Sequence, residues 1–143
     1  MLNTDVKGSS PHVVWSETIS EHGAVVVVDG DLDLETAHQL EAHLARRIAA
    51  GHRHLVVDLT TATFLDSTAM RTLVTTIAPL RDEPDAAVVL AGAHGVVERA
   101  LSVSGIGALF AAYDTRDDAI VGLNDAAEPL RAGWRAVGRR SPA

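Results

Sequence analysis

The chain of 143 residues contains no cysteine, which excludes disulfides, thiolate zinc sites, thiol nucleophiles and cysteine-ligated clusters. It has no apolar run of the length that crosses a bilayer, and its first twelve residues are polar, so the sequence predicts neither a membrane span nor a signal peptide. We therefore expect a cytoplasmic protein. Basic residues are also scarce, 12 against 19 acidic ones. The resulting charge of −7 argues against nucleic-acid binding, because an acidic surface repels phosphate backbones.

What remains is the composition of an ordinary globular domain, with 47% hydrophobic and 22% charged residues. The length corresponds to one domain. Seven histidines raise the question of a metal site, but only the pairs His38/His43 and His52/His54 are close in sequence. A separation of five misses the i, i+4 spacing that places two ligands on one helix face. We expect surface histidines, no metal and no cofactor.

The first half of the chain reads as a hairpin, a helix and a strand. Two β-branched runs, 12–20 and 24–30, flank a short turn that contains glycine, which predicts a β-hairpin. An amphipathic helix follows, with Asp33 as its N-cap and Gly51 at its end. Its apolar positions are Leu34, Ala37, Leu40, Leu44 and Ile48. The continuous apolar run His54–Leu59 predicts a strand buried on both faces.

A polar loop and a second helix come next. Residues 60–66 predict the loop, and residues 67–81 the helix, with Pro79 ending or bending it. The apolar positions of this helix are Met70, Leu73, Val74, Ile77 and Leu80.

The last third of the chain repeats the alternation. Ala86–Gly92 predicts a third buried strand, and a helix that stops at Gly105 follows it. The apolar positions of that helix are Val97, Ala100, Leu101 and Val103. A short last strand is expected near 108–113, and a last helix is capped by either Asp114 or Thr115.

This order of elements predicts an α/β fold. Strands that alternate with helices form crossover units, so the expected architecture is a single domain with a mixed sheet of four to five strands and helices packed mainly on one face. We expect a flexible arm at 1–11, the domain at 12–123 and a basic C-terminal extension at 124–143. Residues 129–143 carry four arginines and no acid. A short helix there would pack on its own domain or face a membrane or partner.

The segment Val56–Leu73 carries the functional information. A buried strand leads into a polar loop that ends in Asp66 and Ser67 at the start of a helix. Such strand ends are where α/β proteins place binding sites. Free backbone N–H groups and the positive end of the helix dipole would receive a phosphate on Ser67 favourably. A plain N-cap role for Ser67 or Asp66 is the competing interpretation. No serine-hydrolase elbow and no glycine-rich nucleotide motif is present.

The run VVDLTTATFLDSTAMRTL resembles the signature of the STAS domain family, in particular the anti-sigma factor antagonists. There an apolar strand ends in Asp-Leu, and a polar loop leads to Asp-Ser-Ser/Thr-Gly and an apolar helix. Two further blocks, VVVVDGDLDLETAHQL and VVLAGAHGVVERALSVSGIGALF, resemble the family in the same order. Similarity covers about residues 12–123. Ala69 departs from the family, which usually has glycine there, and its methyl group is expected to narrow a partner's approach.

The resemblance implies a non-catalytic bacterial regulator. Family members bind an anti-sigma factor, itself a serine kinase of the GHKL ATPase type, and so release a sigma factor. The kinase phosphorylates the serine after the motif aspartate, here Ser67, and a PP2C-type phosphatase restores it. The implied docking face comprises Gly30, Asp31, Asp33, Thr61, Thr63, Phe64, Asp66, Ser67, Thr68, Ala69 and Met70.

Two other functions stay open at this point. The chain could serve as a STAS accessory subunit of a lipid transporter or of a stressosome-like assembly, using the same face as a permanent contact. A hydrolase using Ser67 and a histidine has little support in the motifs. The sequence also leaves open whether the chain forms a homodimer.

Overall fold

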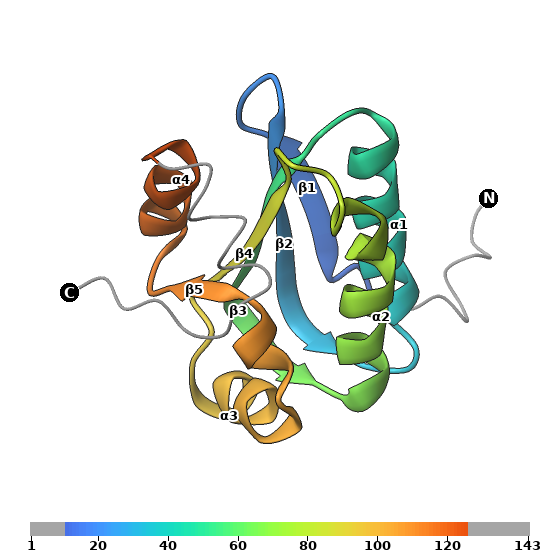
Figure 1. Ribbon diagram of the computed structural model, residues 1–143. Helices are drawn as coiled ribbons and strands as arrows, with labels where there is room; N and C mark the ends of the chain where they lie inside the picture. Colours follow the sequence, from blue (N-terminus) through green and yellow to red (C-terminus); the bar gives the residue numbers. More distant parts are fainter. Residues whose placement is uncertain (1–10, 126–143) are drawn as a thin grey trace, which may run out of the picture.

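A single five-stranded sheet organises the protein, whose computed structural model describes residues 11–125 (Figure 1). The strands lie in chain order, and β1 runs antiparallel to β2 while the other neighbours are parallel. Their bounds are β1 Val14–Thr18, β2 Gly23–Leu32, β3 His54–Leu65, β4 Ala87–Ala91 and β5 Ala111–Tyr113. The helices are α1 Ala37–Ala49, α2 Ser67–Ile77, α3 Gly95–Ser104 and α4 Arg116–Asp125, with 3-10 turns η2 Ala78–Leu80 and η3 Ile106–Leu109. The predicted α/β fold and mixed sheet are confirmed.

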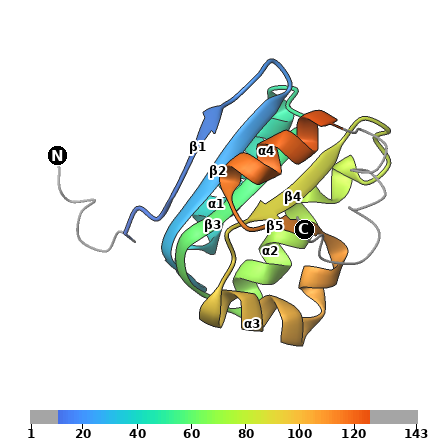
Figure 2. The same ribbon diagram turned by 90° about the vertical axis from the view of Figure 1, so that its left-hand side faces the viewer.

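The strand order explains where the helices lie. Each connection from β2 to β5 moves to the next parallel strand in the same direction, and right-handed crossovers then bring their helices to the same face. Helices α1 and α2 cover that face, α3 packs toward the end of β3, and α4 covers the opposite face (Figures 1 and 2). Three of the four helices thus share one hydrophobic core with the sheet.

The sheet is buried between two cores. Alternate residues of β2 separate, with Val26 in the larger core under α1 and α2 and Val25 in the smaller core under α4. Both side chains are fully buried. This double burial accounts for the continuous apolar runs of β2 and β4, which are typical of strands covered on both faces.

Strand β3 is longer than the sequence predicts. The segment 60–65, expected as a loop, continues the strand by pairing with the end of β2. Two register shifts, between Val27 and Asp29 and between Gly30 and Asp31, insert one extra residue each into β3. Such bulges bend a strand and redirect its side chains. Ala62 and Leu65 still reach the larger core. The threonines at 60, 61 and 63 are exposed, and their polarity made the segment look like a loop.

The helices begin and end close to their predicted limits, with three corrections and one alternative decided. Leu34 and Val103 are 75% and 78% exposed and do not belong to the core. Asp33 is not the N-cap of α1, because a separate turn in which it bonds Thr36 precedes the helix. Of the two candidate caps of α4, Thr115 accepts a hydrogen bond from the backbone amide of Asp118 at 3.0 Å.

The predicted N-terminal arm and C-terminal extension lie almost entirely outside the residues that the structure describes. Residues 1–10 of the expected arm and 126–143 of the expected extension are not among the described residues, and α4 itself continues to Asp125. Within residues 11–125, no helix is both long and apolar enough to span a bilayer.

A buried carboxylate on β3 connects that central strand, through Arg116, to α4 and β1. Asp58 on β3 is 5% exposed and accepts hydrogen bonds from the amide and hydroxyl of Thr60, at 3.0 and 2.6 Å. Its other oxygen accepts from Arg116 Nε of α4 at 2.9 Å, and Arg116 also pairs with Glu17 of β1 at 3.0 Å. Burial raises the pKa of Asp58, but the bonds from Thr60 and Arg116 outweigh it, so the net pKa is lowered.

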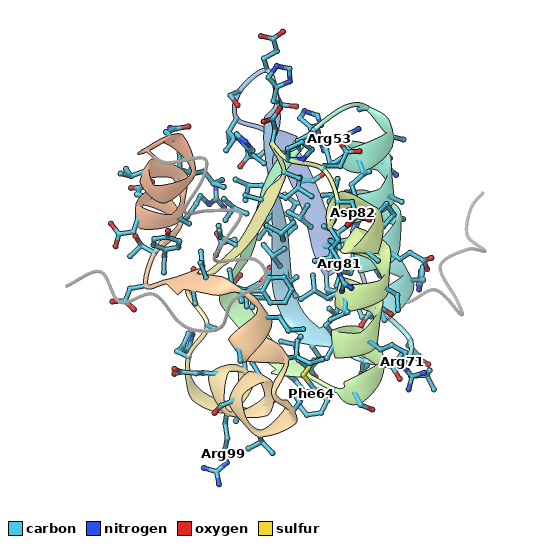
Figure 3. All side chains as sticks on the ribbon, viewed as in Figure 1. Arg53, Phe64, Arg71, Arg81, Asp82 and Arg99 are labelled. Carbon is cyan, nitrogen blue, oxygen red and sulfur yellow. The ribbon has the colours of Figure 1, made fainter. Side chains whose placement is uncertain are left out.

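We expect Asp58 to make the protein acid-sensitive. A folded-state pKa below the unfolded value of about 3.9 gives stabilisation that is present above that pH and is lost as the pH falls through the folded-state pKa. The difference in unfolding free energy between wild type and Asp58→Asn should therefore be largest near neutral pH and shrink below about pH 4. Urea unfolding across this range measures it, with Asp82→Asn, an exposed loop carboxylate (Figure 3), as the control. A difference that stays constant to pH 3 contradicts this role.

Candidate functional site

The junction between β3 and α2 is fixed by Asp66. Its backbone amide donates to the carbonyl of Leu32 at the end of β2, at 3.1 Å. Its side-chain oxygen accepts from the amide of Ala69 at 2.9 Å, so Asp66 is the N-cap of α2. The sequence left the cap open between Asp66 and Ser67, and the structure assigns it to Asp66.

Ser67 is consequently free of a capping role. It is the first residue of α2 and is exposed, and its hydroxyl forms no hydrogen bond with any residue between 11 and 125. The surrounding first turn presents backbone N–H groups that have no partner within the helix. A serine in this position is reachable by a modifying enzyme, and a phosphate attached to it would lie at the positive end of the helix dipole.

The end of β2 supplies the second side of the site. The hydroxyl of Thr63 on β3 donates to the carboxylate of Asp31 at 2.6 Å, across the bulged part of the ladder. Gly30 has φ of +114°, a backbone conformation that side chains disfavour, and it forms part of a groove of about 350 Å³. The groove is lined by Pro11, Val13, Gly30, Asp31, Asp33, Glu35, Thr36 and Thr63.

The structure brings most of the predicted docking residues to one end of the sheet, where β2 and β3 meet α2. Asp31, Thr61, Thr63 and Ser67 are exposed, and Phe64 is 41% exposed (Figure 3). Four further predicted residues are half-buried: Gly30, Asp33, Asp66 and Thr68. We call these nine residues, the five exposed and the four half-buried ones, the docking face.

Two predicted contact residues are not available to a partner. Ala69 is fully buried and Met70 is 7% exposed, with its sulfur accepting a hydrogen bond from Ser104 of α3 at 3.4 Å. Both belong to the larger core instead. The methyl group of Ala69 therefore points into the protein, and the expectation that it narrows a partner's approach is wrong.

A further apolar residue is exposed beside this face. Leu34, assigned to the core by its helical spacing, is 75% exposed on the connection between β2 and α1, next to Asp33. An apolar side chain exposed beside a polar site adds contact area for a partner. The hydrogen-bonded turn between Asp33 and Thr36 places Leu34 before the first residue of the helix. The aspartate and threonine three residues apart are the sequence signal that could have indicated this turn.

The electrostatics of the site are negative. Asp31 lies near the end of β2, Asp33 and Glu35 lie on the connection from β2 to α1, and Asp66 lies between β3 and α2. Among residues 11–125, no group of three or more histidine, aspartate or glutamate side chains is arranged to hold a metal ion. The arrangement presents an exposed hydroxyl, a rim of carboxylates and two exposed apolar side chains, which suits a protein partner.

This fold matches known proteins. The family model for the STAS domain matches residues 15–119. The chain belongs to the STAS domain family. It is 30% identical over 108 residues to RsfB of Mycobacterium tuberculosis, an anti-sigma-F factor antagonist, a match that covers 74% of this chain and 87% of RsfB.

Solved structures agree. An anti-sigma factor antagonist from Mycobacterium paratuberculosis has a TM-score of 0.66 and 30% identity, and the match covers 82% of this STAS chain and 99% of that one. Unphosphorylated SpoIIAA, also an anti-sigma factor antagonist, has a TM-score of 0.68 at 18% identity, covering 79% and 97% of the two chains. The latter likeness shows the fold alone.

Alanine substitutions should distinguish the roles of Asp66 and Ser67 in stability. Asp66→Ala deletes the acceptor for the Ala69 amide and should lower the free energy of unfolding by about 0.5–2 kcal/mol. Ser67→Ala removes no hydrogen bond within the described residues and should leave stability nearly unchanged. Chemical denaturation of both variants measures this. A larger loss for Ser67→Ala than for Asp66→Ala would mean that Ser67 carries the cap.

Proposed function

We propose that this protein is an anti-sigma factor antagonist that binds an anti-sigma factor of the GHKL serine kinase type and thereby releases a sigma factor. Phosphorylation of Ser67 by that kinase switches it off, and a PP2C-type phosphatase restores it. The protein itself performs no catalysis and acts in the cytoplasm. The observation that carries the proposal is the exposed, uncommitted hydroxyl of Ser67 directly after the capping Asp66, within a STAS domain.

The docking face supports protein binding by its composition. Phe64 and Leu34 provide exposed apolar area, and the carboxylates of Asp31 and Asp33 provide charge around it. Apolar contacts at the centre with charged groups at the rim are the usual composition of protein interfaces. The negative rim favours a partner surface of positive charge, which speeds encounter and fixes orientation.

Phosphorylation would act on binding and leave the fold intact. A phosphate adds a charge of about −1.5 to −2 at Ser67, beside Asp66 and within the negative rim. Burying that group against a partner costs several kcal/mol unless it is newly paired, and each 1.4 kcal/mol changes affinity about tenfold. The helix dipole favours the phosphate in the free protein. SpoIIAA in its phosphorylated form retains the likeness to this chain, with a TM-score of 0.61 at 16% identity.

Ser67 is expected to be the main phosphoacceptor. The protein incubated with the GHKL kinase encoded nearest to it and ATP should gain one phosphate, and peptide mapping should place it on Ser67. Ser67→Ala should gain none, and Thr68→Ala, a matched control one residue away, should be modified like the wild type. Phosphate on Thr68 or Thr63 with Ser67 bare would refute the assignment.

Charge at Ser67 should weaken binding to the kinase. Ser67→Asp adds one negative charge without tetrahedral oxygens, so we expect a loss of about tenfold or more in affinity, while Ser67→Ala should bind like the unmodified protein. Both variants should stay folded, because an acidic residue at a helix N-terminus stabilises by about 0.3–1 kcal/mol. Titration calorimetry with the purified kinase measures both affinities. Equal affinities for Ser67→Asp and wild type would show that this charge does not control the interface.

A further inference from the structure

Helix α2 carries a single charged side chain, Arg71. It lies four residues after Ser67, and both residues are exposed. In Figure 3 the side chain of Arg71 extends outward from the first turns of α2, away from the sheet. The charged residues of the β2–α1 and β3–α2 connections, Asp33, Glu35 and Asp66, are all acidic, so Arg71 differs from them in sign.

Arg71 has no structural task in the described part of the protein. Arg53 is paired with Glu83, and Arg116 with Asp58 and Glu17. Between residues 11 and 125, by contrast, the guanidinium of Arg71 forms neither an ion pair nor a side-chain hydrogen bond. The N–H groups of its guanidinium are available to bind another group.

The spacing of the two residues suits a charge pair. Side chains at i and i+4 are neighbours on a helix surface, with Cβ atoms about 5–6 Å apart. The favourable order places the acidic group first and the basic group four residues later, because each then also suits the helix dipole. Ser67 becomes the acidic member only when it carries a phosphate. A guanidinium matches phosphate oxygens with two parallel hydrogen bonds, which an ammonium group does not.

We propose that Arg71 is the intramolecular counter-ion of the phosphate on Ser67. This rests on the proposed phosphorylation of that serine. In the unmodified protein Arg71 is a solvated side chain beside the docking face. After modification it folds back along α2, binds two phosphate oxygens and holds the group on the helix surface. The pair stabilises the modified state and makes a phosphatase displace Arg71 before it reaches the phosphorus atom.

The ionisation of the phosphate reports this contact directly. Phosphoserine can be incorporated at position 67 during translation, so the measurement needs no kinase. A cation beside the phosphate favours its dianion and lowers its second pKa, which is about 6 in the free group. Phosphorus NMR titration should give a value about 0.2–0.4 units higher in Arg71→Gln than in the wild type, the shift that corresponds to an exposed i, i+4 ion pair. Arg71→Lys should restore part of the difference.

Arg99→Gln is the matched control, because Arg99 is an exposed arginine on α3 that does not follow Ser67 on its helix (Figure 3). It should leave the phosphate pKa unchanged, and 1 M salt should reduce the effect of Arg71→Gln. Thermal unfolding gives a second readout: Arg71→Gln should lower the melting temperature of the phosphorylated form more than that of the unmodified form.

Equal phosphate pKa values in wild type and Arg71→Gln overturn the inference, even if the kinase modifies Ser67. If Arg71→Gln and Arg99→Gln shift the phosphate pKa equally, the shift comes from the overall charge of the protein. That result also overturns the inference. Failure of the kinase to modify Ser67 would refute the proposed function alone, since the translated phosphoserine still reports whether Arg71 binds it.

Discussion

Two hydrogen bonds of one residue fix the junction on which the proposed docking face depends. Asp66 is held to β2 through its amide and to α2 through its carboxylate, at 3.1 and 2.9 Å. Asp66 lies between the last residue of β3 and the first residue of α2, and the residue after it is exposed. Ser67 is thereby placed outside, and its hydroxyl is spared from capping. The rest of the docking face depends on this junction, since β2 reaches it from the other side.

The bulges in β3 have a related effect. Each adds a residue to one strand without lengthening its partner, so the end of β3 turns relative to β2. Thr63 then meets Asp31, while Ala62 and Leu65 stay in the core. The segment combines the regularity of a strand with the exposed side chains of a loop. A rigid backbone that presents polar groups needs little ordering when a partner binds.

Sequence reasoning recovered the order of elements because the apolar periodicities of α1, α2 and α3 and the runs of β2 and β4 are strong. It failed where contacts between distant segments determine the secondary structure. The end of β3 looked like a loop because its threonines are polar, yet pairing with β2 makes it a strand. Leu34 fits a helical repeat but precedes the helix. The motif located Ser67, and helical spacing placed Met70 on the apolar face of α2. The burial of Ala69 depends on the rotation of α2 against the sheet, which spacing alone does not specify.

The ion-paired Arg116 has a consequence for synthesis on the ribosome. It bonds Asp58, which is 58 residues earlier in the chain, and Glu17, which is 99 residues earlier. The smaller core also requires Ala119 and Leu123 of the same helix. While the chain emerges, β1 to β4 can pair, but one face of the sheet stays apolar and uncovered until α4, the last described helix, is released. Nascent chains of this protein should therefore need protection from aggregation until α4 has emerged, when most of the sheet already exists.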